Sequence, residues 1–93
     1  MKTLRTAVIG LGRIGWRFHV PQIIQHDGFD LIAVVDPLQE RLDQARSEYG
    51  LRGYPDQKAL LDAEPLDLIV IASPTQFHAD QTLAAFERGI DVF

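Results

Sequence analysis

Short apolar segments alternate along the chain with longer amphipathic ones. Three of the apolar segments are typical of parallel strands buried on both faces, since they are short, continuous and rich in Val, Ile and Leu. They lie at residues 5–9, 31–35 and 66–72. Residues 53–55 give a weaker edge-strand signal, and residues 90–93 begin a further strand. The pattern therefore predicts five strands.

The intervals between these strands predict helices, because their apolar residues recur at helical spacing. The first is expected to be kinked or divided at Pro21, since an interior proline costs about 3 kcal/mol. Pro37 suits the first position of the second helix, where no N–H is needed. Asp56 is a suitable N-cap for the third. The four expected helices lie at residues 13–25, 37–49, 57–62 and 76–88.

The resulting order is β-α-β-α-β-α-β-α-β. It predicts an α/β fold, a Rossmann-like doubly wound parallel sheet with right-handed crossovers and helices on both faces. A chain of 93 residues fits one small domain, so residues 1–93 are expected to form a single dinucleotide-binding unit.

The turn after the first strand has the spacing G-x-G-x-x-G. Gly10 allows the strand to turn sharply, Gly12 lacks the Cβ that would keep a pyrophosphate from the backbone, and Gly15 lets the new helix lie close to the strand. The backbone N–H groups of Arg13 and Ile14 then face outward at the positive end of the helix dipole. For the Arg13 side chain, a ligand contact and simple exposure are both open. Because the turn stands between a strand and a helix, it predicts a phosphate cradle.

Asp36 follows Gly15 by 21 residues, at the carboxyl end of the second strand. There its carboxylate can accept hydrogen bonds from the hydroxyls of an adenosine ribose, and it would repel a 2′-phosphate. The predicted cofactor is therefore NAD, with NADP disfavoured. A second interpretation is that Asp36 caps the helix beginning at Pro37. Arg41 is the one residue that favours NADP, although its position is also typical of a solvated helix face.

The loop Ser73-Pro74-Thr75 follows the fourth strand, at the carboxyl edge where the strand order should reverse. Ligands bind outside that edge in open α/β sheets, so these residues are candidates for cofactor contact. Alternatively, Ser73 or Thr75 caps the following helix. No nucleophile-elbow sequence surrounds Ser73, and the three histidines are too scattered to suggest a metal site.

Composition excludes several other classes of protein. The formal net charge of −4 argues against nucleic acid or an anionic membrane as the main partner. With no cysteine, the chain forms no disulfide, which agrees with a reducing compartment. No apolar run approaches the roughly 20 residues that span a bilayer, and no signal-peptide core follows the first residues. A cytoplasmic location is expected.

Together the motifs resemble the N-terminal domain of the glucose–fructose oxidoreductase/inositol dehydrogenase (Gfo/Idh/MocA) family. The resemblance covers essentially the whole chain. It implies that the glycine turn holds the pyrophosphate of NAD(P), Asp36 the adenosine ribose, and Ser73–Thr75 the nicotinamide half. It also implies that His78 stands near the nicotinamide, although a structural role for His78 is equally open. The residues that carry it are Gly10–Gly15, Ala33–Pro37, Ile71–Thr75 and His78.

The family continues into a Glu-Lys-Pro motif with a catalytic lysine and a second domain, whereas this sequence stops at Phe93. The expectation is a truncated, catalytically inactive part of an oxidoreductase that acts on a sugar, cyclitol or related polyol. A stand-alone nucleotide-sensing module and an engineered folding or assembly fragment are the alternatives. Truncation would expose a strand edge and apolar helix faces, so self-association as a symmetric dimer is expected.

Overall fold

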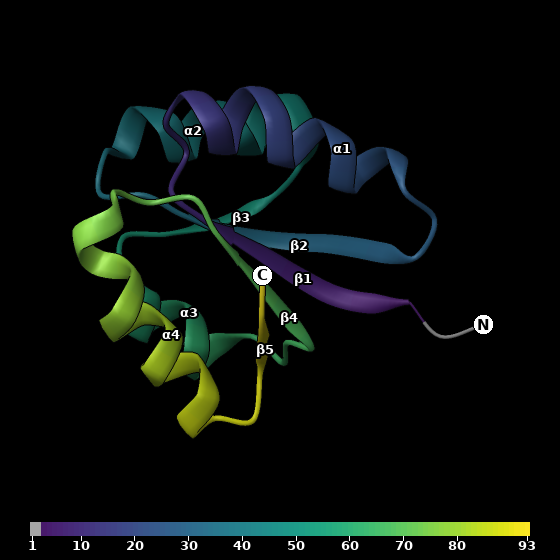
Figure 1. Cartoon of the computed structure of the whole chain (residues 1–93). Coiled ribbons are helices and arrows are strands. Elements are labelled where there is room, and N and C mark those ends of the chain that lie inside the picture. Colours follow the sequence, from purple (N-terminus) through teal and green to yellow (C-terminus); the bar gives the residue numbers. More distant parts are fainter. Residues whose placement is uncertain (1–2) are drawn as a thin grey trace.

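The computed structural model describes residues 3–93, so the first two residues of the expected domain lie outside the described residues (Figure 1). The strands are β1 (Leu4–Ile9), β2 (Phe29–Val35), β3 (Arg52–Tyr54), β4 (Leu68–Ile71) and β5 (Asp91–Val92). The helices are α1 (Val20–Gln25), α2 (Gln39–Tyr49), α3 (Gln57–Ala63) and α4 (His78–Glu87). A π-helical segment (Gly15–His19) runs directly into α1, and a 3₁₀ turn (Thr75–Phe77) runs into α4.

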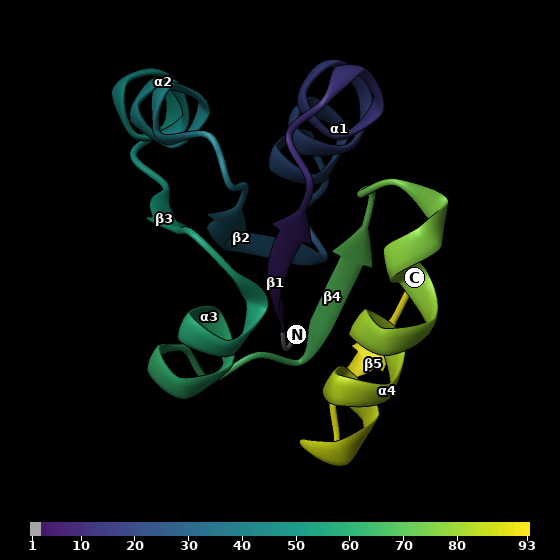
Figure 2. The same ribbon diagram turned by 90° about the vertical axis from the view of Figure 1, so that its left-hand side faces the viewer.

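The five strands form one parallel sheet in the order β3-β2-β1-β4-β5. Helices α1 and α2 cover one face, and α3 and α4 cover the other (Figure 1). Figure 2 shows β1 between β2 and β4, where the strand order reverses. The predicted α/β fold with a doubly wound parallel sheet is therefore confirmed.

The core consists of two layers, one on each face of the sheet. Because successive strand residues point to opposite faces, Val8 of β1 packs beneath α1 and α2 while its neighbour Ile9 packs toward α3 and α4. Val34 of β2 and Val70 of β4 join the first layer, and Ile69 joins the second. Burial on both faces explains why the central strands read as continuous apolar runs.

The first helix is divided close to Pro21, as predicted. The N–H of Val20 donates to the carbonyl of Gly15, five residues earlier, which gives the π-helical geometry of this segment. Pro21 then lies in the first turn of α1, where a missing N–H is tolerated.

The prediction that Pro37 opens the second helix is wrong. Helix α2 begins at Gln39, and Leu38, with extended backbone, is its N-cap residue. The reason is a side-chain hydrogen bond: Asp36 Oδ1 accepts the N–H of Leu38 over 2.9 Å and holds Pro37 in a turn before the helix.

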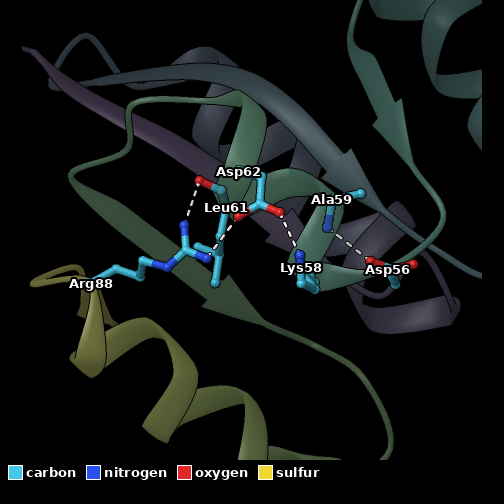
Figure 3. Close-up of polar contacts among 6 residues, drawn as sticks. All are labelled: Asp56, Lys58, Ala59, Leu61, Asp62 and Arg88. Atoms are coloured by element: carbon cyan, nitrogen blue, oxygen red, sulfur yellow. Dashed lines mark hydrogen bonds and ion pairs between the residues drawn. The ribbon is translucent and has the colours of Figure 1, made fainter.

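Asp56 caps α3 as predicted, since its Oδ1 accepts the N–H of Ala59 over 2.8 Å (Figure 3). This bond fixes where the chain turns from β3 into α3.

Exposed ion pairs lie within α3 and between α3 and Arg88 at the end of α4 (Figure 3). Asp62 pairs with Lys58 and with Arg88, each over 2.8 Å, and Arg88 also donates to the carbonyl of Leu61 over 3.0 Å. The hydrogen bond from Lys58, and next that from Arg88, lower the pKa of Asp62 below its usual range. Because these side chains are exposed, the pairs contribute little to the stability of the domain.

A buried carboxylate holds the edge strand β3 beside α3. Glu64 accepts hydrogen bonds from the Arg52 guanidinium and from the hydroxyl of Tyr54. The bond from Arg52 is the main cause of the lowered pKa of Glu64, and the same carboxylate raises the pKa of Tyr54. The carbonyl of Tyr54 accepts the N–H of Asp36 over 3.2 Å, so this cluster also supports the end of β2.

Candidate cofactor site

A cavity of about 640 Å³ opens at the carboxyl ends of β1, β2 and β4. Its volume lies within the range of small-molecule sites. The loops after these three strands meet there because the strands are neighbours in the sheet. Of the ten predicted cofactor residues, Gly15 and His78 do not line the cavity. The other eight do: Gly10, Gly12, Arg13, Ile14, Asp36, Ser73, Pro74 and Thr75.

The three glycines of the turn have different environments. Gly10 has a φ of +97°, and a Cβ there would lie 2.7 Å from the backbone N of Ser73. A Cβ on Gly15 would lie 1.9 Å from the carbonyl oxygen of Gly10. Around Gly12 a Cβ would meet no atom of the chain within 4 Å. Packing requires the first and third glycines, whereas the second keeps the cavity side of the turn open.

In the first hydrogen bond of the helix after the turn, the N–H of Trp16 donates to the carbonyl of Gly12 over 2.9 Å. The N–H groups before it, including those of Arg13 and Ile14, have no acceptor within the helix. They stand at the positive end of its dipole, beside the cavity, which suits a pyrophosphate. Trp16 itself packs on the apolar layer and makes an edge contact with the ring of Tyr49, 5.5 Å between centroids.

Asp36 connects two of the loops that form the cavity. Its side chain is 2% exposed, and Oδ2 accepts the N–H of Leu11 over 2.9 Å and a hydrogen bond from Arg41 Nη1 over 3.2 Å. Its other oxygen accepts the N–H of Leu38. The carboxylate thus ties the glycine turn to the turn before α2. It organises the approach to α2 without being the N-cap residue itself.

The interpretation that Ser73 or Thr75 caps the next helix is wrong. The N-cap residues of the 3₁₀ turn and of α4 are Pro74 and Phe77, and neither helix start has a side-chain cap. The hydroxyl of Ser73 instead donates to the side-chain oxygen of Gln81, one turn into α4. The hydroxyl therefore donates to a side chain on the helix surface, whereas a capping hydroxyl would accept a backbone N–H.

His78 is the first residue of α4, and its Nε2 is hydrogen-bonded to the carbonyl of Ser73. Since His78 does not line the cavity, its direct contacts support the loop.

Several cavity residues had no signal in the sequence. They come from the loop between β3 and α3 and from the start of α4, and no motif marks them. They are Pro55, Gln57, Phe77 and Gln81, together with Asp56, which was predicted only as a cap; Arg41 of α2, which the sequence marked as the residue that favours NADP, also lines the cavity. Gln57 also donates to the carbonyl of Gln81 over 2.8 Å, joining two walls of the cavity.

Residues 3–93 contain neither a metal-binding cluster nor a membrane-spanning helix. No cluster of three or more His, Cys, Asp or Glu residues there has the arrangement to hold a metal ion. Among the same residues, none of the helices combines the length and apolar character needed to cross a membrane.

Residues 4–93 match a family described as an oxidoreductase family with an NAD-binding Rossmann fold, GFO_IDH_MocA. The chain belongs to the Gfo/Idh/MocA family. The resemblance in the sequence motifs is therefore confirmed, and the domain is the family's NAD-binding Rossmann domain.

Relatives with known activities cover nearly the whole chain. It is 34% identical over 92 residues to scyllo-inositol 2-dehydrogenase (NAD(+)) of Bacillus subtilis, covering 97% of this chain and 27% of that protein. It is 34% identical over 93 residues to D-glucoside 3-dehydrogenase of Escherichia coli, covering 96% of this chain and 26% of that protein. The chain thus spans about a quarter of the length of these relatives.

A similar solved structure is scyllo-inositol dehydrogenase from Lactobacillus casei with bound NAD(H) and scyllo-inositol. The two share 30% identity with a TM-score of 0.92, over 99% of this chain and 27% of that one. The Rossmann domain described here therefore has the same fold as the corresponding part of that enzyme.

Proposed function

We propose that this chain is the NAD-binding part of an oxidoreductase that acts on a sugar, cyclitol or related polyol. The observation that carries the proposal is the open space at Gly12, beside the start of a helix and in one cavity with Asp36. The similarity to inositol and glucoside dehydrogenases supports the substrate class.

Each predicted residue has a role in this proposal. The backbone at Gly12, Arg13 and Ile14 binds the pyrophosphate, and Asp36 accepts hydrogen bonds from the adenosine ribose. Gly10 and Gly15 give the turn its shape. The loop Ser73, Pro74 and Thr75 lies along the nicotinamide half, and His78 positions that loop through the carbonyl of Ser73.

The bound nicotinamide would accept or supply the hydride in such a reaction. The described residues around the cavity offer binding groups, but no pair of acid and base aligned for proton transfer. We therefore propose that the 93-residue chain binds the cofactor without catalysing the reaction alone.

Gly12→Ala tests the cradle directly. We expect the free energy of unfolding to stay within about 0.5 kcal/mol of wild type, because the new Cβ meets open space in the free protein. The affinity for NAD should fall at least about tenfold, since the methyl group occupies the approach of the pyrophosphate to the backbone. Calorimetric titration with NAD and ADP, beside urea unfolding, measures both. NAD affinity equal to wild type in a folded variant would contradict the proposed cradle.

We also propose that the 93-residue chain self-associates. Leu83 and Phe86 are 58% and 59% exposed on one side of α4, and the side chain of Phe93, next to edge strand β5, is 78% exposed. Exposed apolar side chains and an unpaired strand edge favour association. Light scattering at micromolar concentration should give the mass of a dimer, and a Leu83→Gln/Phe86→Gln variant should weaken association. A well-folded wild-type monomer would refute this proposal.

A further inference from the structure

Two glutamine side chains form one wall of the cofactor cavity. Gln57, the first residue of α3, and Gln81, one turn into α4, both line it. The side-chain N–H of Gln57 donates to the backbone carbonyl of Gln81 over 2.8 Å. The side-chain oxygen of Gln81 in turn accepts the hydroxyl of Ser73. The fold therefore holds each of the two amide groups in one orientation.

The other half of each amide group is unused by the fold. Within residues 3–93, neither the side-chain oxygen of Gln57 nor the side-chain NH2 of Gln81 has a hydrogen-bond partner. The neighbouring Asp56 also lines the cavity, and only its Oδ1 is used, to cap α3. The wall thus carries two unused acceptors, on Gln57 and Asp56, and one unused donor, on Gln81.

This wall lies at the adenosine end of the proposed site. The loop with Asp56 and Gln57 follows β3, and β3 lies beside β2 on the side away from the glycine turn. The two strand ends are joined, since the N–H of Asp36 donates to the carbonyl of Tyr54 over 3.2 Å. Gln81 continues the wall from Gln57 toward the loop after β4. A dinucleotide that extends from the glycine turn past Asp36 therefore brings its adenine to this wall.

We infer that Gln57 and Gln81 select adenine by its 6-amino group and the ring nitrogen beside it. The amino group is a donor and suits the oxygens of Gln57 and Asp56, whereas the ring nitrogen is an acceptor and suits the NH2 of Gln81. Glutamine pairs with adenine through the same donor and acceptor pattern in nucleic-acid recognition.

The fixed orientation of the two amide groups makes the wall selective. Turning the amide of Gln81 would present its NH2 to the Ser73 hydroxyl, and turning that of Gln57 would present an oxygen to the carbonyl of Gln81. A purine with a 6-oxo group therefore places its own oxygen against acceptors. This inference rests on the proposed binding of NAD by the same cavity, and it adds a preference for adenine over hypoxanthine.

NAD and nicotinamide hypoxanthine dinucleotide are matched probes, because they differ only in the purine, where a 6-oxo group and an N1 proton replace the 6-amino group. We expect wild type to bind NAD at least about tenfold more tightly by calorimetric titration, since the analogue leaves groups of the wall unpaired. This ratio needs no variant, so it tests the inference even if a variant does not fold.

Gln81→Glu keeps an oxygen that accepts the Ser73 hydroxyl but replaces the NH2 donor with a second acceptor. Its added charge weakens the binding of both dinucleotides, so the ratio of the two affinities is the measurement. We expect this ratio to fall to about threefold or less, because the N1 proton of hypoxanthine can donate to the new oxygen and adenine has no such proton. Gln57→Met removes the oxygen that opposes the 6-oxo group and should lower the ratio as well.

Gln25→Glu is the control, because it makes the same change of charge in α1, at a residue that does not line the cofactor cavity. It should leave the ratio at the wild-type value. Wild-type affinities within about threefold of each other, or a wild-type ratio kept by either variant, would overturn this inference and leave the NAD site standing. Binding of neither dinucleotide would overturn the proposed function as well.

Discussion

Gly15→Ala is expected to unfold the domain or to destabilise it by about 3–5 kcal/mol, a large part of the stability of a small domain. The added Cβ would lie 1.9 Å from the carbonyl oxygen of Gly10 and 3.3 Å from the Cβ of Ala72. Gly10 cannot easily move away, since its N–H donates to the carbonyl of Val35 over 2.8 Å. The helix would have to shift off the sheet, losing the packing of its buried face.

Urea unfolding, followed by circular dichroism, measures this loss. Gly12→Ala is the matched control, because it adds the same methyl group to the same turn where the chain leaves open space. We expect the Gly12 variant to unfold at the wild-type midpoint and the Gly15 variant to be unfolded or to unfold at much lower urea. Equal urea midpoints for the Gly12 and Gly15 variants would contradict the close contact between the start of the helix and the end of β1 at Gly15.

Asp36→Ala is expected to reduce both stability and NAD binding. The truncation leaves the backbone N–H groups of Leu11 and Leu38 without their acceptor, at a site where Asp36 is buried. Each unpaired group costs about 1–3 kcal/mol, so a total loss of about 2–6 kcal/mol is expected. Two ribose hydroxyls also lose a charged acceptor, and NAD affinity should fall by about a hundredfold or more.

Asp36→Asn removes the negative charge of the side chain but keeps its shape, so it separates the effects of the two. Its single side-chain oxygen can replace only one of the two carboxylate oxygens, so we expect a stability between those of wild type and Asp36→Ala. Calorimetric titration with NAD and urea unfolding should be made on all three proteins. If Asp36→Ala were as stable as wild type and bound NAD with wild-type affinity, neither the bridging nor the ribose role of Asp36 would hold.

The strands and the phosphate turn were predictable because their signals are local. Residues 31–35 form a continuous apolar run, which is what burial on both faces of a parallel sheet requires, and they lie within β2 (Phe29–Val35). The spacing of Gly10, Gly12 and Gly15 likewise predicts where the backbone turns and where the turn has no room for a Cβ. Neither prediction depends on which residues from distant parts of the sequence pack nearby in space.

The predictions that failed depended on which hydrogen-bond partner a side chain takes. Asp36 lies 25 residues from Leu11, whose N–H it accepts, and its further bond to Leu38 delays the start of α2 past Pro37. The hydroxyl of Ser73 is taken by Gln81, on the next helix. In each case the side chain has several possible hydrogen-bond partners, and the packed structure determines which of them lies within reach.

By itself, the sequence determined the class of fold, the phosphate turn and the acidic residue at the end of β2, because hydrophobic periodicity and glycine spacing act within a few residues. The tertiary structure alone decided which loops share a cavity and that the carboxylate of Asp36 accepts the N–H of Leu11 in the glycine turn. These follow from the strand order β3-β2-β1-β4-β5, which makes neighbours of β1 and β4 although most of the chain lies between them. Contacts between loops so far apart are set by sheet pairing and packing, which no local pattern specifies.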